Sequence, residues 1–301
     1  MSVATAELAP DVLVSQRSRP PLAGPVAAGF IILVVLVGIL APVLAPADPL
    51  RQHLQDSLLP PGSRMGGTLY LLGTDDLGRD VLSRLIYGIR PLTVVVSLAV
   101  ASSAAVGFVY GLVAGYLGGR VDVAMMRLAD MQLSIPPIIL AILLAFLLRP
   151  GVTSSAAAIA FVTWPGYGRL VRSEVLRVRS SDYVQLARVA GLQGPRLVWG
   201  HVVPNVLNAF AVLVTLNIAI AVLISAALSF LGLGVEPPQA DWGNMLAEGV
   251  RLLNTWWMVV LPGAAVTALI LASNTAGDWV RDALDPRAGW RVKPAGAAAA
   301  G

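Results

Sequence analysis

The sequence contains no cysteine, only two histidines and a single lysine, Lys293. Without cysteine there are no disulfide bonds, no thiolate nucleophiles and no metal sites with cysteine ligands. His53 and His201 are too few for a zinc site built from histidine. The chain also lacks a Gly-x-x-x-x-Gly-Lys-Ser/Thr motif, so it does not hold ATP in the usual phosphate-binding loop. These absences exclude the common metal centres and nucleotide-binding loops.

Charged residues are also scarce. They make up 13% of the 301 residues, whereas an ordinary soluble domain has roughly 25%. Hydrophobic residues make up 56%, the mean hydropathy is +0.76, and the charges gather between long uncharged apolar runs. This pattern excludes a soluble enzyme, a disordered chain and a disulfide scaffold. It predicts an all-α integral membrane protein.

Six segments are predicted to cross the membrane, because a hydrocarbon core of about 30 Å needs roughly 20 apolar residues in a helix. Five runs contain no acidic or basic side chain: Pro25–Leu44, Leu92–Leu117, Met131–Leu148, Val206–Leu233 and Leu252–Gly277. The sixth segment, Val152–Val171, is rich in Ala, Ser and Thr and is interrupted by Pro165. Its small residues suit a helix that packs among other helices rather than against lipid.

The arginines predict the orientation. With six crossings and a cytoplasmic N-terminus, 14 of the 21 basic residues fall in cytoplasmic segments. Basic residues accumulate on this side of the membrane, so both termini are predicted to be cytoplasmic. The net charge of +4 and the pI near 9.8 then need no nucleic acid as a partner. The first apolar run is longer than a signal-peptide core, so we expect a retained membrane anchor and not a cleaved signal peptide.

Three glycines repeat at intervals of four in the second predicted crossing. Gly107, Gly111 and Gly115 therefore lie on one stripe of a helix. Such a stripe lets a second helix approach to backbone contact, which predicts a packed bundle of helices. It indicates no particular activity.

The segment from Leu72 to Gly88 is the first of three polar regions with a distinctive pattern. From Asp80 onward its apolar spacing predicts a short amphipathic helix, capped by Thr74 or Asp75 and ended by Gly88. Its acidic residues suggest either a cation site or ion pairs with nearby arginines. Ion pairs are favoured, because hard cations require more oxygen ligands than this spacing offers. The candidate residues here are Asp75, Asp76, Arg79 and Asp80, with Arg84 as a further ion-pair partner.

The second region, Arg172–Asn205, is polar, basic and predicted to be cytoplasmic. Residues 181–191 read as a short helix that Ser181 or Asp182 caps and Gly191 ends. A second short helix is expected from Pro195 to about His201, and Pro204 is expected to break the chain before the fifth crossing. Because both ends are tied to membrane spans, a docking surface is favoured over a DNA-binding helix–turn–helix.

The third region is the outer loop Gly232–Trp257. Trp242 falls where an interfacial aromatic belt is expected, which is the favoured interpretation. Alternatively, Glu236 and Trp242 contact a passing substrate or an outer partner.

These regions carry a family resemblance. Leu72–Asp80 precedes the second crossing, Tyr183–Asn205 has the form of an EAA motif, and Leu228–Leu246 with Gly277–Arg287 forms a last outer loop and tail. On these motifs, the sequence resembles the C-type membrane subunit of bacterial ABC importers of the dipeptide/oligopeptide/nickel class. The resemblance covers roughly residues 25–290.

The resemblance implies a type I ABC importer permease fold with six transmembrane helices and a cytoplasmic coupling helix. It divides the chain into a cytoplasmic tail (1–24), a first helix with an extracytoplasmic segment (25–90), a permease domain (91–287) with an EAA-like loop at 181–205, and a disordered tail (288–301). It also implies a non-catalytic subunit that forms the translocation pathway for di- and oligopeptides.

The partners that the resemblance implies are a homologous B-type permease, two ATPases and an extracytoplasmic binding protein. The ATPases, not this chain, would bind ATP and Mg²⁺. Coupling to the ATPases is assigned to Tyr183, Gln185, Ala187, Arg188, Gly191 and Pro204. Gln185 and Leu186 stand where the family motif has Glu and Ala, so one charge contact with the ATPase is in question.

Two alternatives remain open at this stage. The first is the same kind of importer with another cargo, such as nickel or glutathione. The second is an ion-coupled secondary transporter. Such transporters usually carry ionisable residues or broken helices near mid-membrane, whereas the predicted spans here are almost free of charge.

Overall fold

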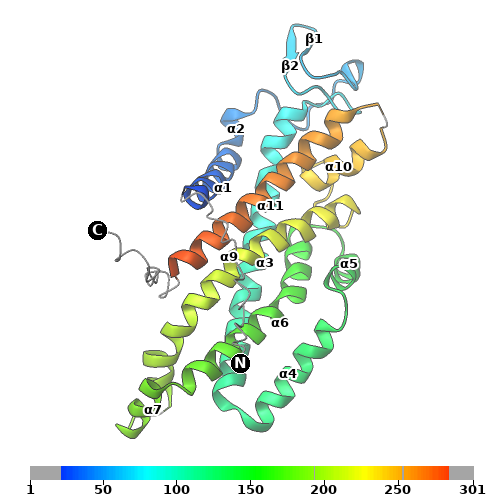
Figure 1. The fold of residues 1–301 in the computed structure, drawn as a ribbon. Helices are drawn as coiled ribbons and strands as arrows, with labels where there is room; N and C mark the ends of the chain where they lie inside the picture. The colour runs from blue at the N-terminus through cyan, green and yellow to red at the C-terminus, as the bar shows by residue number, and fades with distance from the viewer. Residues whose placement is uncertain (1–21, 193, 253, 285–301) are drawn as a thin grey trace, which may run out of the picture.

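The structure is a computed structural model that describes residues 22–192, 194–252 and 254–284 as an elongated helical bundle (Figure 1). Its helices are α1 (Ala23–Ile39), α2 (Ala41–Leu44), η1 (Leu54–Asp56), α3 (Val81–Leu117), α4 (Gly119–Leu133), α5 (Pro137–Leu148), α6 (Val152–Arg179), α7 (Asp182–Val189), α8 (Pro195–Leu197), η2 (Val198–Val202), α9 (Val203–Phe230), α10 (Trp242–Val250) and α11 (Trp256–Leu284). Strands β1 (Ser63–Met65) and β2 (Thr68–Tyr70) form an antiparallel hairpin. Apart from the start of α1, the predicted terminal tails lie outside the described residues.

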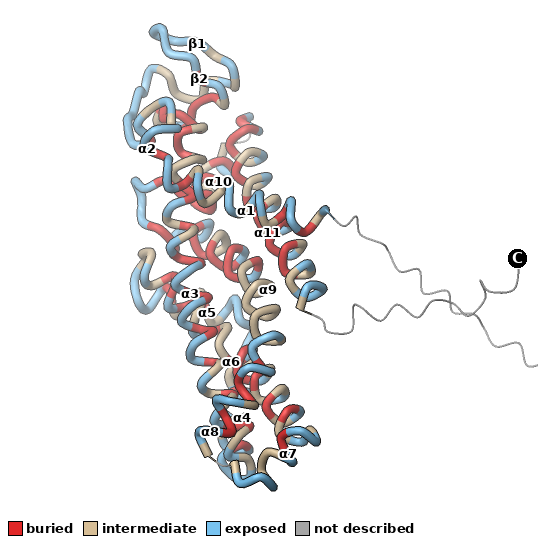
Figure 2. The backbone as a smooth tube through the Cα atoms, turned by 90° about the vertical axis from the view of Figure 1, so that its left-hand side faces the viewer, coloured by how far each residue is buried: buried red, intermediate tan, exposed pale blue. Residues whose placement is uncertain are grey.

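The long helices α3, α6, α9 and α11 run along the bundle, and shorter elements gather at its two ends (Figure 1). The hairpin, α2 and α10 lie near the start of α3, a region called the outer end here. At the opposite, cytoplasmic end, α7 lies beside the bases of α6 and α9. Both names follow the orientation predicted from the arginines. Buried residues follow the contacts between the helices (Figure 2).

Three helices in the described residues are long and apolar enough to cross a membrane: Val81–Leu117, Pro195–Phe230 and Trp256–Leu284. The helices α4 and α5 meet this test only together, as a pair bent by 84°. α1 is apolar but has only 17 residues, and α6 is long but less apolar. The fold is therefore mostly helical with three strongly apolar spans, and six crossings remain a prediction.

Helix α3 is longer at its start than the sequence predicts. Instead of a separate surface helix ended by Gly88, one helix runs through Gly88 and Pro91 to Leu117. Asp80, rather than Thr74 or Asp75, caps it by accepting a hydrogen bond from the Ser83 N–H at 2.7 Å. Gly88 is buried, and a Cβ there would lie 2.9 Å from Cδ1 of Trp242. Close packing by a distant tryptophan, rather than helix termination, explains this glycine.

Prolines divide two of the predicted spans. Met131–Leu148 contains the end of α4, a break and then α5, because Pro136 and Pro137 have no N–H to donate and restrict the residue before them. Pro25–Leu44 likewise divides at Leu40, shortly before the proline in α2. Pro165, by contrast, lies inside a continuous α6, which runs beyond its predicted end to Arg179.

Pro204 does not break the chain before α9, contrary to the prediction. α8, η2 and α9 join into a single helix of 36 residues. Pro204 lies in the first turn of α9, just after the π-helical turn, whose hydrogen bonds run from i to i+5. Proline is tolerated there because its missing N–H is not needed by the regular α-helical ladder. The side chain of Asn205 donates to the carbonyl of His201 at 2.8 Å, which satisfies one acceptor at this junction.

The predicted glycine stripe is confirmed as a close contact with α6. A Cβ on Gly111 would lie 2.7 Å from the Cβ of Val171, and one on Gly115 would lie 2.9 Å from the Cβ of Val175. Gly107 faces the backbone of α6 near Trp164 at 2.6 Å. α3 and α6 accordingly share the most extensive contact between any two described elements.

Replacing Gly111 with alanine should therefore force α3 and α6 apart. We expect a loss of about 1–3 kcal/mol in the free energy of unfolding, the usual cost of overpacking. The measurement is denaturation of the purified chain in mixed micelles. Gly166→Ala is the matched control in α6, because no atom lies within 4 Å of its added Cβ. Equal stabilities of the two variants would contradict the close contact.

Candidate functional sites

A cluster of ionised side chains lies at the outer end. This outer ionic cluster consists of Asp75, Asp76, Arg79, Arg84 and Glu248. Asp75 is fully buried, and one carboxylate oxygen accepts hydrogen bonds from the backbone N–H groups of Leu77 and Arg79 at 2.9 and 2.8 Å. Its other oxygen accepts from Nε of Arg79 at 2.6 Å and from Nη1 of Arg84. One carboxylate thus bridges two buried guanidinium groups.

Glu248 supplies the second counterion. Its carboxylate lies 2.7 Å from Nη1 of Arg84 and 3.4 Å from Nη2 of Arg79. Sequence reasoning missed Glu248 because it missed α10. A local signal was present, since Asp241 caps α10 by accepting hydrogen bonds from the N–H groups of Gly243 and Asn244 at 2.9 and 3.2 Å. The ion pairs join α10 to the start of α3.

The acidic residues of this region separate into two roles. Asp75 pairs with Arg79 and Arg84, as the sequence predicts, and Asp76 lies 3.7 Å from Arg79. Asp80 belongs to no described ion pair and caps α3 instead. Carboxylate oxygens of Asp75, Asp76 and Glu248 lie within 4.8 Å of one another. Their contacts with two guanidinium groups account for this grouping without a cation.

Three titratable groups at the outer end have pKa values that their surroundings raise. Burial, together with the nearby negative charge of Asp75, raises the pKa of Asp76. Burial and the hydrogen bond to Asp56 raise the pKa of Tyr70 to about 12, so the Tyr70 hydroxyl stays protonated and donates to Asp56 at 2.8 Å. Burial also raises the pKa of Asp241, against the hydrogen bonds that the carboxylate accepts.

The two candidates of the last outer loop lie in different environments. Trp242 is buried, and its Nε1 donates to the carbonyl of Leu85 at 2.9 Å. It holds α10 against α3, so contact with an external partner through Trp242 is excluded in this conformation. Glu236 is exposed on the loop before α10 and has no described ion pair.

At the cytoplasmic end, α7 forms where the local signals predict it. Ser181 precedes the helix, although its hydroxyl donates to the Val178 carbonyl instead of capping α7. The helix ends at Gly191 with φ of +88°, the left-handed conformation that favours glycine. Leu192 N–H donates to the Ala187 carbonyl and Gly191 N–H to the Arg188 carbonyl, both at 3.0 Å. These two bonds form a Schellman C-cap.

Helix α7 has two distinct faces. Val184 is fully buried and packs in a cluster with valines of α6, including Val175, and with Val202 of η2. On the other side Tyr183, Leu186 and Val189 are 43%, 68% and 87% exposed. Three large apolar side chains on a short surface helix indicate a contact surface. The buried face thus fixes α7 to the bundle, and the opposite face is exposed in the described structure.

Three other predicted coupling residues belong to α7 itself. Gln185 is exposed and its side chain donates to the Ser180 carbonyl at 3.0 Å, whereas Ala187 is half-buried. Arg188 lines a groove of about 480 Å³ between α7 and the end of α6. The Tyr183 hydroxyl lies 3.4 Å from the carbonyl of His201 in η2. The structure brings all of these residues to one end of the molecule.

Two arginines of α6 link this helix to α4 and to α3 at the cytoplasmic end. Arg172 forms a bidentate ion pair with Asp122 of α4, with N···O distances of 2.5 and 2.6 Å. Nη1 of Arg179 donates to the carbonyl of Tyr116 at 3.0 Å, at the C-terminal end of α3. α3, α4 and α6 are therefore linked close to the point where α7 leaves α6.

Long apolar helices with a small two-faced helix at the cytoplasmic end are typical of a membrane permease that docks onto a soluble partner. The sequence matches the family model for the binding-protein-dependent transport system inner membrane component over residues 107–290. The chain belongs to this family, and this confirms the resemblance seen in its motifs.

Relatives support this assignment over most of the chain. The dipeptide transport system permease protein DppC of Haemophilus influenzae is 42% identical and covers 86% of this chain and 88% of its own. The di/tripeptide permease DppC of Pseudomonas aeruginosa is also 42% identical, over 86% of each chain. A crystal structure of an amino acid ABC transporter with histidines matches with a TM-score of 0.53 at 14% identity, over 66% of this chain and 94% of the other. This last likeness concerns the fold alone.

Asp75→Asn should strongly destabilise the outer end. Asparagine keeps an oxygen for the two backbone N–H groups but leaves Arg79 and Arg84 with one carboxylate fewer in a buried site. We expect a loss of about 3–5 kcal/mol in the free energy of unfolding, measured in mixed micelles. Asp76→Asn is the matched control and should change stability by less than about 0.5 kcal/mol, because Asp76 is 46% exposed. A loss below about 1 kcal/mol for Asp75→Asn would contradict the role of the ion pairs.

Proposed function

We propose that this chain is a permease subunit of an ATP-driven importer and forms part of the pathway by which short peptides cross the membrane. Family membership supports the transport role, and the peptide permeases of Haemophilus influenzae and Pseudomonas aeruginosa support the substrate class. The subunit itself is non-catalytic, and separate ATPases hydrolyse ATP. Neither relative is named for nickel or glutathione transport, and family membership gives no support to an ion-coupled transporter.

The observation that carries the coupling part of this proposal is the two-faced helix α7. Its exposed apolar face would bind the ATPase, and its buried face would pass displacement to α6 and α9. Val184 makes this possible because it belongs to the same buried cluster as side chains of both helices. Tyr183, Gln185, Ala187, Arg188, Gly191 and Pro204 are the residues to which we assign coupling. A rigid element with two positions is a common means of transmitting such movements.

The membrane arrangement that we propose has six crossings and both termini in the cytoplasm. α1, α3, the bent pair α4–α5, α6, α9 and α11 would be the crossings. The clustering of Arg172, Arg177, Arg179 and Arg188 at one end supports this orientation. It places α7 in the cytoplasm and the outer ionic cluster on the other side.

The assembly that we propose contains a second, B-type permease, two ATPases and an extracytoplasmic binding protein. A permease of a binding-protein-dependent system implies the ATPases and the binding protein as partners. The B-type subunit is the finer part of the proposal. Exposed apolar side chains on α3, such as Val106 and Val109, leave helix surface for such a partner or for lipid.

Leu186→Asp should weaken binding of the ATPase without unfolding the permease. Leu186 is exposed, so an aspartate there costs little in the isolated chain but places a charge in the proposed interface. We expect about tenfold or greater loss of ATPase co-purification and a parallel loss of peptide uptake. Ser173→Asp is the control, because it adds the same charge to an exposed position of α6 outside α7. Unchanged co-purification would show that α7 is not the docking helix.

Gly191→Val should uncouple ATP hydrolysis from peptide transport. The residue has φ of +88° and no atom within 4 Å of its Cβ position, so a β-branched side chain strains only the backbone that ends α7. The complex should assemble and hydrolyse ATP, while peptide uptake into proteoliposomes should fall several-fold. Gly191→Asn is the matched control, because asparagine tolerates this conformation and should retain most uptake. Normal uptake by the valine variant would remove Gly191 from the coupling residues.

A further inference from the structure

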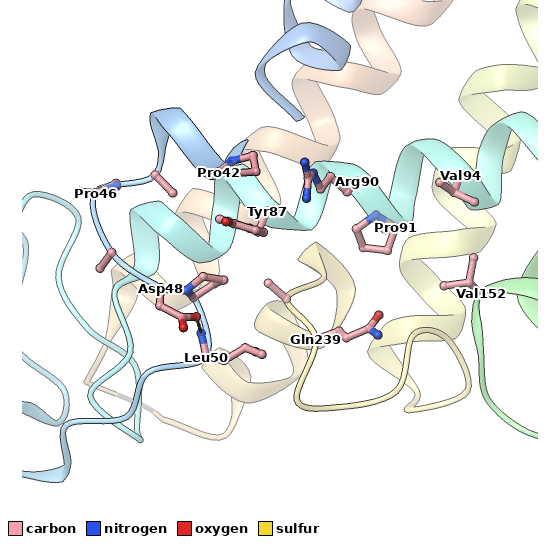
Figure 3. A pocket seen from close by; sticks show the side chains of 14 residues that line it. Pro42, Pro46, Asp48, Leu50, Tyr87, Arg90, Pro91, Val94, Val152 and Gln239 are labelled. Carbon is pink, nitrogen blue, oxygen red and sulfur yellow. Dashed lines mark hydrogen bonds between the residues drawn. The ribbon is translucent and has the colours of Figure 1, made fainter. Parts of the chain in front are cut away.

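The outer end contains a cavity of about 860 Å³ whose lining does not include the outer ionic cluster. Its lining comes from α2 and the segment that follows it, from one side of α3, and from residues 152 and 239–240 (Figure 3). The polar residues among them are Asp48, Tyr87, Arg90 and Gln239. Cavities of roughly 300–1,000 Å³ with a few polar groups are typical of small-molecule sites.

Hydrogen bonds hold the walls of this cavity in place. Arg90 donates from Nε to the carbonyl of Gly38 at 2.8 Å and from Nη2 to the carbonyl of Ile39 at 3.0 Å, which ties α3 to the end of α1. Ala47 N–H donates to Oγ of Ser83 at 3.0 Å, which ties the segment after α2 to α3. Prolines at 42, 46, 49 and 91 further restrict the backbone of the lining. The cavity is therefore largely preformed.

The cavity is lined by one acidic side chain, Asp48, and one basic side chain, Arg90. Each has a polar atom that makes no hydrogen bond among the described residues. Oδ1 of Asp48 accepts from the N–H of Leu50 at 2.9 Å, and Oδ2 has no hydrogen bond or ion pair among the described residues (Figure 3). The third guanidinium nitrogen of Arg90, Nη1, is likewise without a described hydrogen bond, and the guanidinium lies 5.5 Å from the ring centre of Tyr87. No described ion pair joins Asp48 to Arg90, although both line the cavity.

We propose that this cavity binds the zwitterion of a short unblocked peptide, with its ammonium group at Asp48 and its terminal carboxylate at Nη1 of Arg90. Charge-assisted hydrogen bonds of this kind are stronger than neutral ones. The peptide side chains would lie against Tyr87, Val94 and Val152. A dipeptide, about 7 Å in extended length, fits a space of this volume. This inference rests on the proposed function and adds a peptide-binding site on this chain at the outer end.

The test uses the assembled transport complex in nanodiscs of phosphatidylcholine. The probe is L-alanyl-L-photoleucine, whose diazirine inserts into nearby groups on illumination, and mass spectrometry locates the labelled residues. We expect labelling of the segments 42–50 and 87–94. Unlabelled dialanine should compete, whereas its N-acetyl and C-terminal amide forms should compete at least about tenfold less well.

Asp48→Asn is the decisive variant, because asparagine keeps the oxygen that accepts from Leu50 N–H and removes only the charge. We expect about tenfold less labelling and loss of the preference for the free amino terminus. Arg90→Gln should remove the preference for the free carboxylate. Arg64→Gln is its control, because Arg64 is an exposed arginine of β1 outside the cavity and should leave labelling unchanged.

Three results would overturn the proposal. The first is labelling confined to other segments, and the second is labelling unaffected by Asp48→Asn or by blocked termini. The third is a photoactivatable phosphatidylethanolamine that labels the cavity and is not displaced by excess dialanine, since its headgroup carries the same pair of charges. Peptide uptake is measured with the same complex reconstituted into proteoliposomes. Uptake without cavity labelling would overturn only this site, whereas absence of uptake would overturn the proposed function.

Discussion

The close approach of α3 and α6 is the contact on which the rest of the bundle depends. At Gly107, Gly111 and Gly115 the two helices meet at distances that leave no room for a Cβ. Between helices in a membrane, such approach matters because lipid is as apolar as the side chains and burial alone gives little driving force. Packing of backbone against backbone supplies the missing attraction. It makes α3 and α6 one structural unit, which α1, α4, α5 and α9 contact directly.

That unit joins the two candidate sites. The start of α3 carries Arg84 and therefore fixes the outer ionic cluster, while the end of α6 leads directly into α7. Each end has its own cross-links to neighbouring helices: Glu248 of α10 at the outer end and Asp122 of α4 at the cytoplasmic end. The ionised groups of both clusters lie at helix ends and not along the apolar middle. This distribution avoids the high cost of a charge deep in the membrane.

Much of the architecture follows from local sequence signals. The apolar runs predict the long helices, and Gly191 predicts the end of α7, because each depends on residues that are near neighbours in the chain. The errors occur where a distant segment decides. Trp242, which makes Gly88 a packing residue, bonds to a carbonyl 157 positions earlier, and Glu248 pairs with an arginine 164 positions earlier. No spacing rule within one segment contains this information.

The prolines also show that local sequence alone does not predict where a helix breaks. Pro136 and Pro137 divide α4 from α5, whereas Pro165 and Pro204 lie within continuous helices. The cost of the missing N–H depends on the position of the proline, because the first turn of a helix does not use that N–H whereas the interior does. Pro204 directly follows the π-turn, and the Asn205 side chain donates to the His201 carbonyl, which the Tyr183 hydroxyl of α7 also approaches. The π-turn at the base of α9 therefore lies where α7 meets a long span of the bundle.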